Sequence, residues 1–267
     1  MMFTLSPEQT DLAAVLHEFL AAGRTDLTAL GVDEVTDPVD LVVLFEELGH
    51  HAVPGPLAES LAVLPVLGAG PGSVAFPPHV PHAVEADRYY LVEDDTLREA
   101  APVASIESVD PARRLVKLAA GPVVATGVPA ARAFDLGVLT CSAQLLGLGR
   151  AMLELTTAHA RSRTQFGRPI GGFQAVKHHL ANVLIGLELA RPLVFGAAVT
   201  LSSRDVSAAK VAASDAAWQA ARTALQVHGA IGYTAEHGLG RFLLQTRALR
   251  TAWGSPSMHR SRVLEAL

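Results

Sequence analysis

The chain has 267 residues, of which half are hydrophobic and only 18% are charged, and this length is enough for one large domain or two small ones with a substantial core. The formal net charge of −5 leaves no basic surface to neutralise phosphates, which argues against a nucleic-acid partner. The single cysteine, Cys141, excludes an internal disulfide and a cysteine-based zinc site.

The start of the chain, Met1–Glu8, has neither a basic segment nor a long apolar run, so we do not expect a signal peptide. The chain contains no stretch of about 18 uncharged apolar residues, so we expect no membrane partner. Alanine and leucine are abundant, and both favour helix. These features predict a cytoplasmic and mainly α-helical protein.

Residues 1–70 are predicted to form an N-terminal helical segment. The first helix starts at the capping box Ser6–Gln9, with proline at its first position, and runs to about Ala22. A second helix is expected over 37–49 by the same reasoning, and a third over 57–67. Apolar residues at helical spacing give the first two helices one buried face each.

Residues 71–129 are predicted to form a reduced β module. Short runs with strand character occur at 88–92, 103–106, 115–118 and 123–126, and turn residues separate them. We expect three to five strands. Because a sheet of this size is only marginally stable alone, it should lie against helices.

Residues 130–267 return to a helical pattern. Long helices are predicted at about 130–162, 172–201, 204–228 and 236–250, joined by short connections rich in glycine or serine. Four such helices form an antiparallel four-helix bundle. The expected fold class is therefore mainly α, with N-terminal helices, a reduced central β module and a C-terminal four-helix bundle.

Two motifs lie at the ends of these predicted bundle helices. The first is RTQFGRPI at Arg163–Ile170, followed by FQAVKH at Phe173–His178, and the second is QVHGAIGYTAEH at Gln226–His237. In this order and at this separation they resemble the acyl-CoA dehydrogenase family. The resemblance is close from about 140 to 250 and looser over 1–70, where LFEELG and PLAES are similar to the family's N-terminal helices.

The resemblance implies contact with an FAD that is bound mainly to a neighbouring subunit. Arg163 would hold the pyrophosphate, which suits the charge and the fork geometry of a guanidinium. Phe166 would pack on the cofactor, and Gln165 and Gln174 would form hydrogen bonds near it.

The second motif, by the same resemblance, would take the other end of the FAD. Gln226 and the backbone from Gly229 to Gly232 would contact the adenosine and the pyrophosphate, because glycine permits close backbone approach. The alternative interpretation of both motifs is a polar helical hairpin with a glycine-rich turn and no cofactor.

Histidine pairs and isolated serines give weak signals. The pairs His50–His51 and His178–His179 place two imidazoles at adjacent helix positions, which do not share a face, so we expect no metal site. Ser142, Ser255 and Ser257 lack the G-x-S-x-G context of a serine hydrolase.

The family needs a carboxylate to remove the α-proton while hydride passes to the flavin, and this base must reach that proton. On this sequence the position of the glutamate in many members is Trp253, and the position on the first bundle helix in other members is Gly137. Asp135 lies two residues away, so its side chain points about 200° around the helix from that position. Glu236 follows the glycine turn of the second motif and is interpreted as structural. The sequence therefore predicts no catalytic residue.

The β module is also shorter than the family's, and 71–128 contains no segment that maps onto the flavin-ring contacts. Loss of the base together with retention of the FAD motifs resembles the non-catalytic, β-like subunits of heteromeric actinobacterial dehydrogenases for steroid CoA thioesters. This resemblance implies an α₂β₂ assembly with one FAD per pair, in which the partner binds the acyl-CoA. Two alternatives stay open: a complete homo-oligomeric flavoenzyme of altered chemistry, and a cofactor-free scaffold or binding protein in which Arg163 pairs with a carboxylate.

Overall fold

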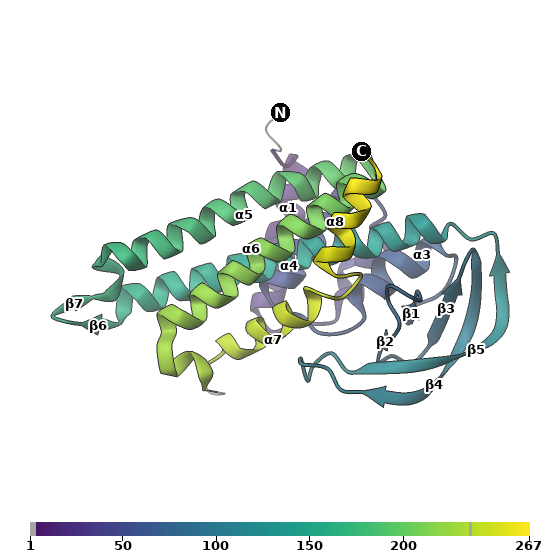
Figure 1. Ribbon diagram of the computed structural model, residues 1–267, viewed down its shortest axis with the longest axis horizontal. Helices are drawn as coiled ribbons and strands as arrows, with labels where there is room; N and C mark the ends of the chain where they lie inside the picture. Colours follow the sequence, from purple (N-terminus) through teal and green to yellow (C-terminus); the bar gives the residue numbers. More distant parts are fainter. Residues whose placement is uncertain (1–3, 235–236) are drawn as a thin grey trace.

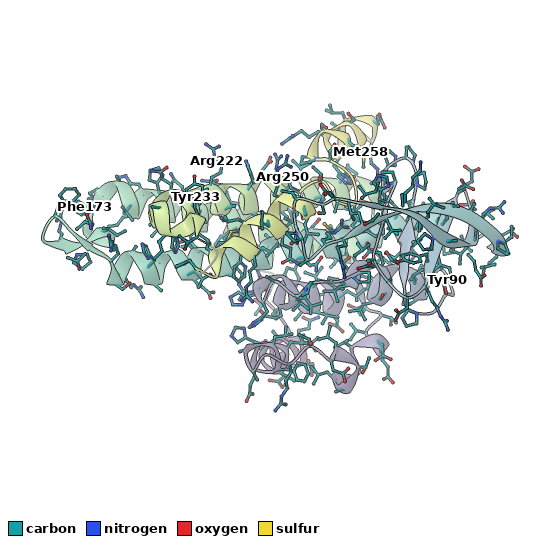
Figure 2. All side chains as sticks on the ribbon, turned by 90° about the horizontal axis from the view of Figure 1, so that it is seen from below. Tyr90, Phe173, Arg222, Tyr233, Arg250 and Met258 are labelled. Carbon is teal, nitrogen blue, oxygen red and sulfur yellow. The ribbon has the colours of Figure 1, made fainter. Side chains whose placement is uncertain are left out.

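The computed structural model describes residues 4–234 and 237–267 (Figure 1). Three long helices, α4, α5 and α6, run side by side through the molecule, with bounds Ala130–Ser162, Gln174–Thr200 and Ser203–His228. A small sheet lies beyond one end of these helices, and a short hairpin lies at the opposite end (Figure 1). The N-terminal helices pack along one flank of the long helices (Figure 2). The mainly α-helical fold predicted from the sequence is confirmed.

The first two N-terminal helices form where the sequence predicts them. Helix α1 covers Pro7–Ala21, and its capping box at Ser6 is present. Helix α2 covers Pro38–His50, and Asp37 caps it by accepting hydrogen bonds from two backbone amides. Helix α2 buries apolar residues on several of its faces, because it lies between α1 and α4.

The third N-terminal helix differs in its geometry from the prediction. It begins at Leu57, passes through a π-helical stretch at Glu59–Val63 and ends as α3 at Leu64–Val66. Two short 3₁₀ turns, which the sequence analysis did not predict, join α1 to α2; they cover Leu27–Leu30 and Val32–Glu34.

The β module is one five-stranded sheet in the order β1-β3-β4-β5-β2. The pair β1 and β3 is parallel, and the other pairs are antiparallel. The strands are Ser73–Ala75, Ala83–Val84, Tyr89–Glu93, Thr96–Ile106 and Leu115–Thr126.

Strand β5 joins two segments that the sequence analysis separated, 115–118 and 123–126. Gly121 and Pro122 between them look like a turn in the sequence. In the structure they lie at an irregularity in the β4–β5 pairing, where Arg98 pairs with Val123 and Ala100 pairs with Ala120. A β-bulge accommodates glycine and proline without ending the strand, and this is why the prediction was wrong here.

Glycine allows α2 and α4 to approach closely in the centre of the molecule. A Cβ added at Gly49 would lie 2.1 Å from the carbonyl oxygen of Gln144, and one added at Gly147 would lie 1.9 Å from that of Glu46. The alanine-rich face of α6 packs on α4 in a similar way. One continuous apolar core runs through all three segments of the chain, so the division at 70/71 and 129/130 stays a prediction.

Two helices complete the C-terminal part. Helix α7 covers Leu239–Leu249 and packs against α4 and α6. Helix α8 covers Pro256–Glu265 and packs on α6, and the sequence analysis did not predict it. Its start signal is nevertheless present, because Ser255 accepts a hydrogen bond from the Met258 amide and Pro256 occupies the first helical position.

Helices α4 and α5 are each long and apolar enough to cross a membrane by length and composition alone. For α4 this signal reflects a core helix, since 89% of its apolar window is buried inside the protein. For α5 only 39% of the window is buried, so much of its apolar surface faces outwards.

Candidate functional site

The hairpin between α4 and α5 presents an aromatic side chain to solvent. Strands β6 (Thr164–Gln165) and β7 (Arg168–Pro169) are joined by Phe166 and Gly167, whose φ angles of +52° and +77° suit a two-residue turn. A bulky residue rarely adopts positive φ, which costs on the order of 1 kcal/mol. Phe166 is nevertheless 89% exposed, so intrachain packing does not compensate for this backbone. Such a tip is typical of a binding element.

Contacts behind the tip hold the hairpin in place. The Arg168 guanidinium lies 4.1 Å from the centre of the Phe173 ring, and the rings of Phe173 and Phe166 meet edge to face at 6.1 Å. The Ile170 amide donates a hydrogen bond of 2.9 Å to the carbonyl oxygen of Arg163. The hairpin is therefore ordered by its own residues, and the outer face of Phe166 is exposed.

Positive charge gathers at the same end of the bundle. Arg163 is exposed at the end of α4, and none of the ion pairs found within residues 4–234 and 237–267 involves it. Gln174 is the first residue of α5, and the N-cap Phe173 offers that helix no side-chain acceptor. The first amides of α5 therefore lack an intrahelical partner, which favours an anion there. Gln165 is exposed on β6 beside them.

The second motif lies at the end of α6. Gln226 is exposed in its last turn, on a groove shared with residues of α5 and α6 that include His179 and Arg222. Gly229 ends the helix with φ +62°, and Gly232 is buried so tightly that an added Cβ would lie 3.0 Å from the His228 side chain. Both glycines thus serve the tight turn that reverses the chain.

A stack of two imidazoles connects the motifs. His159, one turn before Arg163 on α4, stacks on His228 with ring centres 4.4 Å apart. The pKa of His159 is lowered by burial first, and then by His228, His237 and Arg163. Burial also lowers the pKa of His228. Neutral rings stack without charge repulsion, so this contact brings the ends of α4 and α6 together. The sequence analysis missed His159, although it lies only four residues before Arg163, whose backbone amide donates a hydrogen bond of 2.9 Å to the His159 carbonyl oxygen.

The predicted base positions are filled by an aromatic cluster at the other end of α4. Trp253 is 1% exposed, and its ring centre lies 5.7 Å from that of Phe76 and 6.0 Å from that of Phe134. A Cβ added at Gly137 would lie 2.4 Å from the Trp253 ring. The two alternative positions of the family's base are therefore neighbours in space, and one indole occupies the volume between them.

Asp135, the nearest acid in sequence, is fully engaged. It is buried, and its carboxylate accepts hydrogen bonds from the Ser203 hydroxyl and, at 2.8 Å, from the Arg262 guanidinium. Asp135 thus ties α4 to α6 and α8, which gives it a structural role. Glu236 lies outside the described residues.

One buried acid near Trp253 was missed by the sequence analysis. Glu59 is 3% exposed and lies 3.9 Å from Arg113, and burial raises its pKa. Both residues line a cavity beside Trp253 with a volume of about 20 Å³. This space is enough for roughly one water molecule and far too small for a thioester.

The filled base position and the exposed motif lie far apart. Gly137 and Arg163 are 26 residues apart along α4 and its cap (163 minus 137), which corresponds to about 39 Å. Figure 1 shows the same separation, with α4 starting near the sheet and ending at β6. The two regions therefore lie at opposite ends of α4.

Comparison with known proteins identifies the family of this chain. The family described as "Acyl-CoA dehydrogenase, C-terminal domain" matches residues 127–267, which is more than half of the chain. The chain belongs to the acyl-CoA dehydrogenase family. Acyl-CoA dehydrogenase IpdE2 of Mycolicibacterium smegmatis is 32% identical over 234 residues, which cover 81% of this chain and 75% of IpdE2.

Solved acyl-CoA dehydrogenases share the fold over the whole chain. The ChsE4–ChsE5 complex from Mycobacterium tuberculosis superimposes with a TM-score of 0.77 at 20% identity, covering 99% of this chain and 98% of the matched one. A structure described as "Tcur3481-Tcur3483 steroid ACAD G363A variant" gives 0.76 at 20% identity, covering 98% of both chains. The resemblance found in the sequence is therefore confirmed at the level of family and fold. The roles of Arg163, Gln165, Phe166, Gln174, Gln226, Gly229 and Gly232 stay predictions.

Proposed function

We propose that this acyl-CoA dehydrogenase chain is a non-catalytic subunit of a heteromeric, FAD-dependent acyl-CoA dehydrogenase, and that it lends FAD contacts to a partner subunit. The observation that carries the proposal is the indole of Trp253, which fills the space between both positions where the family's base would lie. An indole has no basic atom, so the side chain at this position cannot remove an α-proton. The motif exposed at the opposite end of α4 can still bind FAD, because binding does not require the base.

The residues at that end fit the phosphate end of FAD. Arg163 has no ion-pair partner among the described residues, and the uncapped start of α5 adds backbone donors, so together they suit a pyrophosphate. The exposed ring of Phe166 suits a flat apolar surface of the cofactor. Gln165, Gln174 and Gln226 would supply neutral hydrogen bonds around it. When bound, FAD supplies the acceptor for the hydride that leaves the acyl group.

The separation along α4 supports sharing between subunits. About 39 Å lie between Gly137 and Arg163, so the motif of this chain would serve an FAD whose reacting ring is held elsewhere. The partner would supply the flavin-ring contacts, the glutamate base and the acyl-CoA pocket. We infer an α₂β₂ assembly with one shared FAD per pair.

A helix face suited to a partner lies on α5. Leu184, Ile185, Leu189, Leu193 and Val199 are all about half exposed or more. Exposed apolar side chains at this density mark an interaction surface rather than a solvated helix. A related subunit of the same fold is the partner we propose, since the similar ChsE4–ChsE5 structure is described as a complex.

The substrate class follows from the relatives and is part of the proposal. One structure of this fold is described as a steroid acyl-CoA dehydrogenase, which favours a bulky, steroid-derived acyl-CoA undergoing α,β-dehydrogenation. We place the complex in the cytoplasm.

Co-expression with an acyl-CoA dehydrogenase chain that retains the glutamate tests the proposal. We expect the two chains to co-purify as a yellow complex with one FAD per pair, and the single chain to be colourless and inactive. If the single chain purifies as a yellow, active homo-oligomer, it is a complete flavoenzyme and the proposal is wrong. If the pair forms without flavin, the chain is a scaffold, although a carboxylate pairing with Arg163, which that alternative requires, is absent from the described ion pairs.

A further inference from the structure

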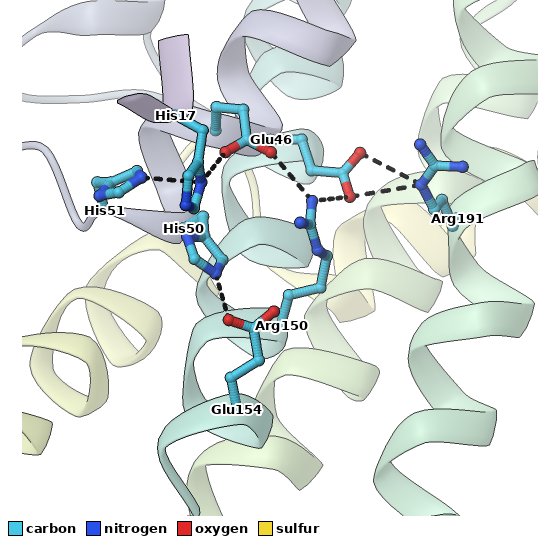
Figure 3. A network of polar contacts seen from close by, with 8 residues as sticks. His17, Glu46, His50, His51, Arg150, Glu154 and Arg191 are labelled. Carbon is cyan, nitrogen blue, oxygen red and sulfur yellow. Dashed lines mark hydrogen bonds and ion pairs between the residues drawn. The ribbon is translucent and has the colours of Figure 1, made fainter. Parts of the chain in front are cut away.

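Three imidazoles and a carboxylate meet where α1 crosses the end of α2 (Figure 3). His17 comes from α1, Glu47 and His50 from the last turn of α2, and His51 from its C-cap. The three rings are mutually close, with centres 4.7 to 5.2 Å apart. This cluster lies outside the FAD motif and has no part in the proposed function.

The nitrogen and oxygen atoms of these side chains that could bind a metal lie close together. Nδ1 of His17 lies 3.0 Å from Oε2 of Glu47 and 3.2 Å from Nε2 of His51. One ligand atom from each of the four residues lies within 4.8 Å of the others. Zinc bonds to nitrogen and oxygen of about 2.0–2.1 Å give a tetrahedron with edges of about 3.3 Å. Two edges of the cluster, at 3.0 and 3.2 Å, are therefore already close to those of a metal site, and the remaining ones would have to shorten by at most about 1.5 Å.

His50 has the surroundings of a metal-binding histidine. Its Nε2 lies 2.9 Å from the Glu154 carboxylate, so this nitrogen carries the proton and donates it. Its Nδ1 is then an acceptor, and it is buried without a partner among the described residues. A buried acceptor left unpaired costs about 1–3 kcal/mol. Metal-binding histidines commonly donate their other ring N–H to a carboxylate, which is the arrangement seen here.

The Glu47 carboxylate is oriented in the same way. Its Oε1 accepts a hydrogen bond of 3.2 Å from the Arg150 guanidinium, which leaves Oε2 directed at His17. Arg150 is itself held by Glu46 at 2.8 Å (Figure 3). Glu154 thus orients His50, and Arg150 orients Glu47. Neither contact uses the atom that faces the other ligands.

Hydrogen bonding alone does not satisfy the cluster. One proton on Nδ1 of His17 cannot form linear hydrogen bonds to Glu47 and His51 at once, and Nδ1 of His50 has no donor.

We propose that His17, Glu47, His50 and His51 bind one zinc-like divalent cation at a structural site, with Glu154 as the outer partner of His50. Four protein ligands without an open position are typical of a structural rather than a catalytic zinc. Helix α1 buries only Leu16 and Leu20 fully, so the ion would add a cross-link that holds α1 on α2. The sequence analysis expected no metal here because it considered His50 and His51 alone. Glu47 at i−3 from His50 was the available local signal, and His17 is brought in only by the fold.

Titration of the metal-free full-length chain with ZnCl₂, followed by calorimetry and elemental analysis, tests the site. We expect one zinc per chain and a higher midpoint of thermal unfolding with zinc than without it. His17→Ala and His51→Ala should abolish zinc uptake at the protein concentration used for the unchanged chain. Glu154→Gln should weaken binding by about 10- to 100-fold, because it acts through His50. The control His178→Ala, at an exposed histidine on α5, should bind zinc as the unchanged chain does.

The experiment needs neither FAD nor a partner, so its outcome is independent of the proposed function. If His17→Ala does not fold, the absorption of Co²⁺ bound to the unchanged chain reports directly whether nitrogen ligands in tetrahedral geometry surround the ion. Absence of binding, or stoichiometric binding that His17→Ala and His51→Ala both retain, would show that the cluster is a hydrogen-bonded network without metal.

Discussion

The indole of Trp253 lies directly on the backbone of Gly137, at a distance where an added Cβ would be 2.4 Å from the ring. These residues are 116 positions apart (253 minus 137) and occupy the two places where a catalytic acid is expected from the family resemblance. Their contact makes both positions part of the buried core. Position 137 therefore favours glycine, because a side chain there would collide with the ring.

Gly137→Ala should therefore destabilise the protein. The new methyl group must displace the buried indole, and such overpacking costs about 1–3 kcal/mol of unfolding free energy. Urea unfolding measures the change. Gly240→Ala in α7 is the matched control, because a Cβ there meets no atom within 4 Å, and alanine is the better helix former. A Gly137→Ala variant as stable as the unchanged chain would show that Trp253 can move aside.

Arg163→Gln should lower the FAD content of the co-expressed complex without changing the fold of this chain. The side chain is exposed, and a charge-assisted hydrogen bond contributes about 1.5–3 kcal/mol, which corresponds to roughly a 10- to 100-fold loss of FAD affinity. Equilibrium dialysis of the complex against FAD measures it. Arg204→Gln, an equally exposed arginine at the start of α6, should leave the affinity unchanged. Equal affinity in both variants would mean that Arg163 does not contact the cofactor.

Phe166→Asn should weaken FAD binding without lowering the stability of the chain. Asparagine tolerates positive φ better than a bulky aromatic residue, and Phe166 makes little contact with its own chain, so the free energy of unfolding should stay the same or rise slightly. In the proposed complex the ring contacts the FAD, so its loss should weaken FAD binding. Thermal unfolding and FAD titration of the same preparation give both results. Weaker stability together with unchanged FAD binding would make the ring a structural element of the hairpin.

Local signals in the sequence predicted most of the helices. Capping residues such as Ser6 and Asp37, and apolar residues at helical spacing, act within one or two turns, so they can be read without the fold. The same holds for the hairpin motif, whose residues Arg163 to Gln174 adjoin in the chain. Strand β5 was divided because Gly121 and Pro122 signal a turn locally, while pairing with β4 overrides them.

Contacts between distant segments could not be predicted in this way. The placement of Trp253 on Gly137 depends on the course of the chain after α7, and the meeting of His17 with His51 depends on how α1 crosses α2. Helical periodicity indicates which face of a helix is buried but not which residue of another helix it meets. The two base positions were predicted from the family resemblance, and only the structure showed that the ring of Trp253 packs on Gly137.

His259 should make the protein lose stability as the pH falls below about 6.5. It is fully buried, its Nε2 donates to the carbonyl oxygen of Trp253 at 2.8 Å, and its Nδ1 accepts from the Ser207 hydroxyl at 3.1 Å. Burial lowers its pKa from 6.5 to about 4. Between these values the unfolded chain binds a proton that the folded chain does not, so unfolding becomes more favourable as the pH decreases, by up to about 3 kcal/mol.

Urea unfolding between pH 4 and pH 7.5 measures this dependence. His259→Gln cannot take up the proton in either state, so its unfolding free energy should be lower at neutral pH but should fall less steeply with acid. The partly buried His159 and the buried His228 have lowered pKa values as well, so part of the slope should remain. His178→Gln, at an exposed position, serves as the control and should keep the full slope. An equally steep slope in His259→Gln would mean that His259 is protonated at the same pH in the folded and unfolded states.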